Sequence, residues 1–176
     1  MTDNERLAEL LFPNISWTPQ QYEEQYPARQ LPEGARVTRF SPSPTGYLHI
    51  GGLFAAMTAR LTAKATSGVF FLRIEDTDKK REVEGGVTAI VTGLAAFGIT
   101  PDEGITGLGT ESGVYGPYQQ SKRREIYQCF AKELVRQGLA YPCFCTEAEL
   151  TALREQQEAQ AVNLSLIHIS EPTRPI

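Results

Sequence analysis

The sequence has 176 residues, of which 41% are hydrophobic and 22% charged, and its formal net charge is −4. These values are typical of a soluble globular protein that is long enough for one domain with a hydrophobic core. No apolar run approaches the roughly 20 residues that span a bilayer, and bulk charge gives no general attraction for nucleic acid. Since the N-terminus also lacks the basic segment of a signal peptide, we expect a cytoplasmic protein that does not interact with membranes.

Residues 1–34 differ in charge from the rest of the chain. They carry six acidic residues against Arg6 and Arg29, whereas acids and bases balance in the remaining residues. Three leucines form a short amphipathic start, and no clear period follows it. We interpret residues 1–34 as an N-terminal extension that wraps around the body of the protein and contains one helix.

The next 40 or so residues are predicted to form a βαβ unit. Residues 35–40 are β-prone and are halted by Pro42, which suits a buried strand. Apolar residues recur at helical spacing from Ile50 to about Thr66. Residues 68–76 then begin with a continuous apolar run of the kind buried in a parallel sheet. The sequence therefore predicts an α/β fold with parallel strands and flanking helices.

Further helices are expected downstream. Apolar residues share one helical face over 83–94 and again over 121–137. Between them, residues 101–117 contain five glycines and two prolines, and we predict a long loop there. Another helix begins after YPCFC, with Thr146 as its N-cap and Glu149 in the capping-box position.

The last segment, LSLIHISEPTRPI (164–176), breaks the preceding helical pattern abruptly. It resembles the translation of a sequencing adapter, and the alternative is a native turn and strand. We expect the native sequence to end near Asn163, so that the chain is a truncated fragment. His168 is therefore not counted among the functional residues.

Two loops are expected at the carboxyl ends of neighbouring parallel strands, where α/β folds bind their ligands. In the first loop, His49 opens a helix whose second and third residues are Gly51 and Gly52. Unpaired N–H groups at a helix start attract anions, and a histidine there can donate a hydrogen bond to a phosphate. The alternative is that His49 is a simple cap. Neither a P-loop nor a dinucleotide-binding fingerprint occurs in the sequence.

The second loop follows Arg73 and Glu75, which alternation places on one face of the second strand. Buried charges must pair with each other or bind a ligand, because an isolated buried charge is costly. Both a structural ion pair and a ligand site remain open.

Taken together, SPSPTGYLHIGG and FFLRIEDTD resemble the catalytic core of glutamyl-tRNA synthetases, which are class I ligases of glutamate and tRNA. His49-Ile50-Gly51-Gly52 is similar to the HIGH signature of the class. The resemblance continues through YGPYQQSKR to YPCFCTEAEL. It implies the N-terminal half of a Rossmann-like catalytic domain over 35–141 and the start of a tRNA-acceptor-binding insertion over 142–163.

The resemblance also implies roles for single residues. Arg39 would grip the carboxylate of glutamate, Glu75 would bind its ammonium group, and Ser41 and Ser43 would adjoin them. His49 and Gly51 would act in catalysis. The implied ATP-binding residues are Ser43, Thr45, His49, Gly51 and Gly52.

The implied reaction uses ATP and Mg²⁺ to form glutamyl-adenylate and then transfers the glutamyl group to tRNA(Glu), in an enzyme expected to be a monomer. Positioning and charge stabilisation are sufficient for such chemistry.

Several departures from the family pattern stand out. Ser41 occupies a position that is usually Ala, and Gln119 one where a basic residue is common. The lysine-rich KMSKS loop, the downstream half of the glutamate pocket and the anticodon-binding region are absent. We therefore expect no aminoacylation by this chain alone. Discrimination between glutamate and glutamine tRNA stays open.

The cysteines give a partial metal motif. Cys143 and Cys145 resemble the first half of a zinc site found in some family members. Two ligands of four do not make a structural zinc site, so we expect no metal in this chain, although zinc would suit a longer parent protein. Cys129 is interpreted as a small buried residue.

The alternatives are sister enzymes and one more distant class. A glutaminyl-tRNA synthetase and a glutamyl-queuosine tRNA(Asp) synthetase share the motifs. A HIGH-type nucleotidyltransferase would share the His-x-Gly-Gly helix start, but RIEDTD is not expected in it. A binding module without activity is disfavoured because both strand-end loops occur together.

Overall fold

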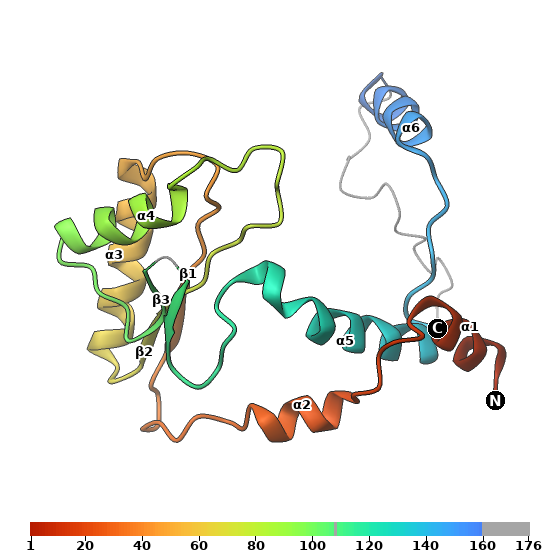
Figure 1. Cartoon of the computed structure of the whole chain (residues 1–176), viewed down its shortest axis with the longest axis horizontal. Helices are drawn as coiled ribbons and strands as arrows, with labels where there is room; N and C mark the ends of the chain where they lie inside the picture. Colours follow the sequence, from red (N-terminus) through yellow and green to blue (C-terminus); the bar gives the residue numbers. More distant parts are fainter. Residues whose placement is uncertain (108, 160–176) are drawn as a thin grey trace. The chain divides into compact units, whose positions relative to one another are not determined.

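The computed structural model describes residues 1–107 and 109–159 and divides the chain into two compact units, Met1–Leu139 and Ala140–Ile176 (Figure 1). The expectation of a non-native tail over 164–176 lies outside the described residues.

A four-stranded sheet forms the centre of the first unit. Its strands are β1 (Val37–Phe40), β2 (Val69–Leu72), β3 (Glu103–Gly107) and β4 (Thr110–Ser112), in the order β1-β2-β3-β4. The pairs β1–β2 and β2–β3 are parallel, and β4 runs antiparallel to β3. The predicted α/β fold with parallel strands is therefore confirmed.

The predicted long loop over 101–117 is wrong, because β3 and β4 lie within it. Gly104 explains the error. Its φ is +122°, and a Cβ there would lie 2.1 Å from the carbonyl oxygen of Leu72. Only glycine allows the two backbones to approach so closely. The glycine that indicated a loop is in fact a requirement of the strand pairing.

Two helices complete the crossovers between the parallel strands. The helix α3 (Ile50–Ala65) packs against β1 and β2, and α4 (Gly86–Ala96) packs against β3. Their buried faces and the central strands share one hydrophobic core, made of Ala56, Ala63, Phe70, Leu72, Ile74, Ile90, Leu94, Ile99, Ile105 and Tyr118. The helix α4 begins three residues later than predicted, since Gly85 adopts φ +74° and ends a turn before it.

The predicted helix over 121–137 is present, but its first turn differs. Residues Gln120–Arg123 form a 3₁₀ turn, η1, and the helix α5 covers Arg124–Arg136. This helix lies against the N-terminal extension rather than against the sheet.

The extension contains two helices rather than the single one predicted. They are α1 (Asp3–Leu11) and α2 (Pro19–Gln25), and both contact α5. Each begins with a capping box, formed by Thr2 with Glu5 and by Thr18 with Gln21. The capping-box pattern, Thr followed three residues later by Glu or Gln, occurs in the sequence at the start of each of these two helices.

In the second unit, the described part contains the helix α6 (Glu147–Ala159). Its predicted cap is confirmed: the backbone N–H of Glu149 donates to Thr146 Oγ1 at 3.3 Å, and the N–H of Thr146 donates to Glu149 Oε2 at 2.7 Å. Within residues 1–107 and 109–159, the structure contains no helix with the length and apolar character needed to cross a membrane.

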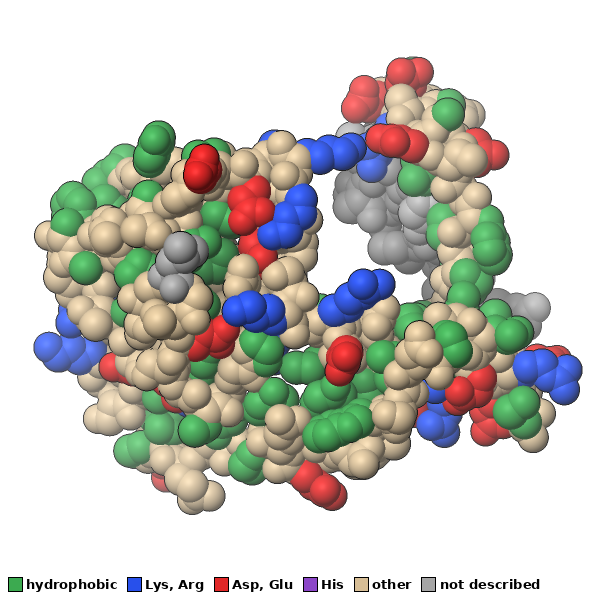
Figure 2. Space-filling view, viewed as in Figure 1, with side chains coloured by type: hydrophobic (Ala, Val, Ile, Leu, Met, Phe, Trp, Pro, Cys, Tyr) green, Lys and Arg blue, Asp and Glu red, His purple; other side chains and the backbone are tan. Residues whose placement is uncertain are grey.

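Acidic and basic side chains lie next to one another on the face drawn in Figure 2, and no broad field of a single sign covers it. This distribution agrees with the near balance of charge beyond the N-terminal extension. It gives no bulk electrostatic argument for a particular ligand.

Candidate functional site

The loop between β1 and α3 places His49 at the start of a helix, as predicted. Its Nδ1 accepts a hydrogen bond from the backbone N–H of Gly51 at 3.2 Å, so the histidine is the N-cap of α3. Because Nδ1 is the acceptor, the proton of the neutral ring belongs on Nε2. The ring is exposed, so Nε2–H is a donor available to an anionic ligand beside the free N–H groups of the helix.

A cavity of about 300 Å³, here called the helix-start cavity, opens beside this cap. It brings together four of the residues predicted to bind the nucleotide: Ser43, Thr45, His49 and Gly52. Gly51 lies directly under the histidine ring, where a Cβ would come within 3.0 Å of His49 Cε1. The remaining lining residues are Phe40, Pro42, Gly46, Tyr47, Leu48 and Ile90.

Residues 73–76, here called the strand-end segment, continue from β2 beside the chain that leaves β1. The N–H of Arg73 donates to Phe40 O at 3.1 Å, and the N–H of Glu75 donates to Pro42 O at 3.0 Å. These bonds hold the strand-end segment next to Ser41 and one residue from Ser43. The two predicted loops therefore meet, as expected for the carboxyl ends of parallel strands.

Arg73 and Glu75 form an ion pair, one of the two interpretations that the sequence leaves open, with 3.0 Å between Arg73 Nη2 and Glu75 Oε1. The pair leaves hydrogen-bonding capacity unused. Arg73 Nε and Ser41 Oγ are both buried without a protein partner among the described residues. Buried polar atoms in native structures generally have partners, so these two mark a place for a ligand or ordered water. Arg39 lies in β1 and is exposed; no described contact joins it to Glu75.

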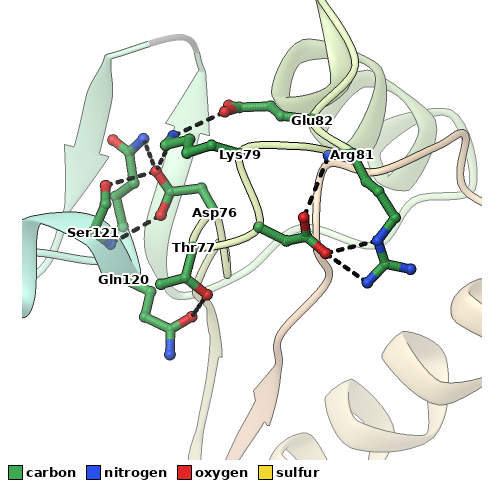
Figure 3. Close-up of polar contacts among 9 residues, drawn as sticks. Asp76, Thr77, Lys79, Arg81, Glu82, Gln120 and Ser121 are labelled. Atoms are coloured by element: carbon green, nitrogen blue, oxygen red, sulfur yellow. Dashed lines mark hydrogen bonds and ion pairs between the residues drawn. The ribbon is translucent and has the colours of Figure 1, made fainter. Parts of the chain in front are cut away.

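Asp76 is the residue that the sequence analysis missed. Its side chain is only 1% exposed, and its carboxylate accepts four hydrogen bonds (Figure 3). The donors are Gln119 Nε2 at 2.8 Å, the N–H and Oγ of Ser121 at 2.9 and 2.6 Å, and Lys79 Nζ at 3.2 Å.

Burial alone would raise the pKa of Asp76, but the hydrogen bonds from Ser121, Gln119 and Lys79 outweigh it and lower the pKa to about 2. Asp76 therefore joins the strand-end segment to residues 118–121, here called the YQQS segment. Gln119, which stands where the resembled family commonly has a basic residue, donates one of these bonds to Asp76.

Farther along the same loop, two exposed ion pairs are drawn in Figure 3. Lys79 Nζ lies 2.8 Å from Glu82 Oε2, and Arg81 Nη2 lies 2.6 Å from Asp78 Oδ2. Exposed pairs of this kind contribute little to stability.

The three cysteines lie in different surroundings, and only the prediction of a buried Cys129 is confirmed. Cys143 and Cys145 are exposed, and Cys129 is buried with its Sγ 3.0 Å from Trp17 O. No group of three His, Cys, Asp or Glu side chains within the described ranges is arranged to hold a metal ion.

Comparison with known proteins gives a consistent result. A family model described as the catalytic domain of class I tRNA synthetases (E and Q) matches residues 36–169. The chain is 55% identical over 156 residues to a glutamate–tRNA ligase of Clostridium perfringens (strain 13 / Type A), covering 89% of this chain and 29% of the relative. A glutamate–tRNA ligase of Acetivibrio thermocellus is 52% identical over 162 residues, covering 92% of this chain and 30% of the relative.

Among solved structures, a glutamate tRNA ligase from Elizabethkingia meningosepticum, in complex with its amino acid, is 42% identical with a TM-score of 0.62. The match covers 74% of this chain and 25% of that one. The chain thus spans less than a third of the length of the curated relatives it matches.

Proposed function

The chain belongs to the class I tRNA synthetase family for glutamate and glutamine, and from this premise we propose that it supplies part of a catalytic domain that attaches glutamate to tRNA through glutamyl-adenylate. One observation carries the proposal beyond family membership. The helix-start cavity and the strand-end segment meet at the carboxyl edge of the parallel strands, joined by the bond from Glu75 N–H to Pro42 O. An anion-binding helix start beside a carboxylate and two arginines suits a nucleotide and an amino acid side by side.

Glutamate would be held by charges of opposite sign. Arg39 would bind a substrate carboxylate through its guanidinium, a geometry that allows two parallel hydrogen bonds. Arg73 occupies Glu75 Oε1, and no residue in the described ranges donates to Oε2, which would accept a hydrogen bond from the substrate ammonium. Ser41 lies between Phe40 and Pro42, whose carbonyl groups accept from Arg73 and Glu75. Its unpartnered Oγ and the hydroxyl of Ser43 would form further polar contacts with glutamate.

ATP would lie with its phosphates at the start of α3. There, His49 Nε2–H and the free backbone N–H groups would offset the charge that grows as a glutamate carboxylate oxygen attacks the α-phosphorus and pyrophosphate leaves. Thr45 and the glycines Gly51 and Gly52 would border the nucleotide. Mg²⁺ would enter with the phosphates, since this ion keeps several waters and few protein ligands. In the second step, a terminal ribose hydroxyl of tRNA would attack the glutamyl carbonyl and release AMP.

The remaining assignments follow the same premise. Residues 142–163 would begin the insertion that binds the tRNA acceptor end. Cys143 and Cys145 supply two thiols, so a zinc site in a longer protein would need further ligands from outside the described residues. We place the reaction in the cytoplasm and assign it to a monomer, and analytical ultracentrifugation of the longer protein would test that state.

A segment exchange tests the proposal. Residues 1–159 would replace the matching segment of the Clostridium perfringens ligase, and ATP–pyrophosphate exchange would be measured with glutamate, glutamine and aspartate. We expect exchange with glutamate alone. Arg39→Gln and Glu75→Gln should each lower kcat/KM for glutamate by roughly 10²- to 10³-fold, because each removes a charge-assisted contact.

Lys132→Met is the matched control. Lys132 lies in α5 and pairs with Glu9 of the N-terminal extension, so its replacement should leave ATP–pyrophosphate exchange unchanged. A folded chimera without glutamate-dependent exchange would refute the proposal. Exchange with glutamine in place of glutamate would do the same and would favour the glutamine branch of the family.

A further inference from the structure

Arg29 links the N-terminal extension to the sheet. Its Nη2 donates to Glu103 Oε2 at 2.7 Å and its Nη1 donates to Glu103 Oε1, while the guanidinium lies 3.7 Å from the ring centroid of Tyr115. Both charged side chains are only 16% exposed. Two parallel bonds, an aromatic face and burial separate this contact from an ordinary surface ion pair. The hydrogen bonds from Arg29 hold the pKa of Glu103 below its usual value.

The same carboxylate fixes Tyr118. Tyr118 Oη donates to Glu103 Oε2 at 2.7 Å and accepts from the N–H of Tyr115 at 3.2 Å. The backbone N–H of Tyr118 donates to Glu111 Oε2 at 2.7 Å, and the residue is 2% exposed. Burial and the bond to Glu103 raise the pKa of Tyr118 to about 12, so its hydroxyl stays a donor at neutral pH.

Tyr118 in turn pairs with the strand-end segment. The N–H of Ile74 donates to Tyr118 O at 2.9 Å, and the N–H of Gln120 donates back to Ile74 O at 2.9 Å. The next residues of the YQQS segment bind Asp76, as shown in Figure 3. One side of the strand-end segment is therefore held by β1 and its continuation, and the other side by residues whose position depends on Glu103.

We propose that Arg29 is a positioning residue, which acts through Glu103 and Tyr118 to fix the strand-end segment that carries Glu75. The N-terminal extension is then part of the site's construction. The inference rests on the proposed function only for what Glu75 binds. The coupling between Arg29 and Ile74 is a property of this chain that is measured without substrate.

Native-state amide hydrogen exchange on the ¹⁵N-labelled chain tests the coupling. Arg29→Met keeps much of the apolar stem but removes both hydrogen bonds to Glu103. We expect the Ile74 and Gln120 amides to exchange at least tenfold faster, because the Tyr118 carbonyl loses its fixed position. The Val69 amide, which donates to Arg36 O on the β1 side, should change less than twofold. Arg29→Lys keeps the charge and should restore part of the protection.

Lys132→Met is again the control. Lys132 binds Glu9 Oε2 and Ile15 O, so its loss loosens the extension on α5 without touching Glu103. It should leave the Ile74 and Gln120 amides unchanged. If Arg29→Met proves unfolded, Tyr115→Leu replaces it, because this variant removes the ring that the Arg29 guanidinium stacks on. Hydrogen exchange is then measured at the Ile74 and Gln120 amides, and both should exchange faster.

Two results would overturn the inference: an unchanged Ile74 amide in Arg29→Met, or equal acceleration at Ile74 and Val69, which would mean general destabilisation. In the chimera described above, Arg29→Met should raise KM for glutamate more than KM for ATP. A chimera without any exchange refutes the proposed function, whereas an active chimera whose glutamate KM ignores Arg29 refutes the positioning role.

Discussion

Asp76→Asn is the sharpest test of how the candidate site is held together. The substitution keeps the size of the side chain but removes the charge that four hydrogen bonds surround. An amide oxygen can still accept from Ser121, whereas the new NH₂ group would face Gln119 Nε2 and Lys79 Nζ, which are donors themselves. The change therefore replaces at least one favourable contact with donors that oppose each other.

The expected magnitude follows from the pKa. A carboxyl whose pKa falls from 3.8 to about 2 on folding contributes roughly 2.5 kcal/mol to the free energy of unfolding at neutral pH. The amide oxygen keeps a bond from Ser121, and the loss of one hydrogen bond to a charged group costs about 1.5–3 kcal/mol, so with the opposed donors we expect a total loss of about 2–4 kcal/mol. Because small domains have about 5–15 kcal/mol of stability, the variant should still fold.

The direction of the pH dependence follows from the lowered pKa of Asp76. The folded pKa of Asp76 lies below the unfolded value, so the stabilisation is fully present above about pH 4 and is lost as the pH falls towards 2. Urea denaturation followed by circular dichroism at pH 7, 5, 4 and 3 would measure the free energy of unfolding of both proteins. The difference between wild type and Asp76→Asn should be largest at pH 7 and should shrink steadily below pH 4.

Asp78→Asn is the control, because Asp78 pairs with the exposed Arg81 and should change stability little. A loss below about 0.5 kcal/mol for Asp76→Asn at pH 7 would show that the four bonds are energetically neutral. An equal difference at pH 7 and pH 3 would show that charge is not the reason for the loss. Either result would refute the account of Asp76 given above.

Three further outcomes are expected. Gly104→Ala should destabilise the fold by more than about 3 kcal/mol in urea titrations, because its Cβ would lie 2.1 Å from Leu72 O. Gly98→Ala is the control: Gly98 has φ +67° but open space around it, and the substitution should cost about 1–2 kcal/mol. Similar losses in the two variants would contradict the steric explanation. In the native chain, the exposed Cys143 and Cys145 should react quickly with a disulfide reagent, while the buried Cys129 should react only after unfolding. Three equally fast thiols would be inconsistent with the buried position of Cys129. Cys143→Ala should speed the reaction of Cys145, because Cys143 raises the pKa of the Cys145 thiol. Thr146→Ala should destabilise α6 by about 1 kcal/mol, seen as faster exchange of the Leu150 amide, and unchanged exchange would mean that the cap contributes nothing.

The βαβ unit and the position of His49 could be predicted from the sequence because their signals are local. A continuous apolar run, helical spacing and a His-x-Gly-Gly start depend on neighbouring residues alone. The strand β3 could not be predicted, since Gly104 indicates a turn until its parallel partner is known to pass within contact distance. The same sequence signal therefore has two structural meanings, and only the tertiary neighbour distinguishes them.

In the candidate site, too, the shared face of residues close in sequence could be predicted, and contacts between distant residues could not. Alternation along one strand places Arg73 and Glu75 on one face, which the sequence predicts, but it does not decide between an ion pair and a ligand site. Asp76 was not singled out, because its partners Gln119 and Ser121 lie more than 40 residues away and come from a turn whose position depends on β3. Arg29 was noted only as a charge in an acidic stretch, since nothing local indicates Glu103 as its partner.

The edge position of β1 has a consequence for handling the isolated chain. In the described sheet, β1 has β2 as its one neighbour, so the outer backbone groups of Val37–Phe40 point away from the sheet. A row of unpaired N–H and C=O groups is a template on which another chain can add a strand. Val37 is exposed there as well, and Arg39 is the charged residue that opposes such addition. The outer edge of β1 is therefore a place at which a second chain can add a strand, and we expect the charge of Arg39 to disfavour that addition.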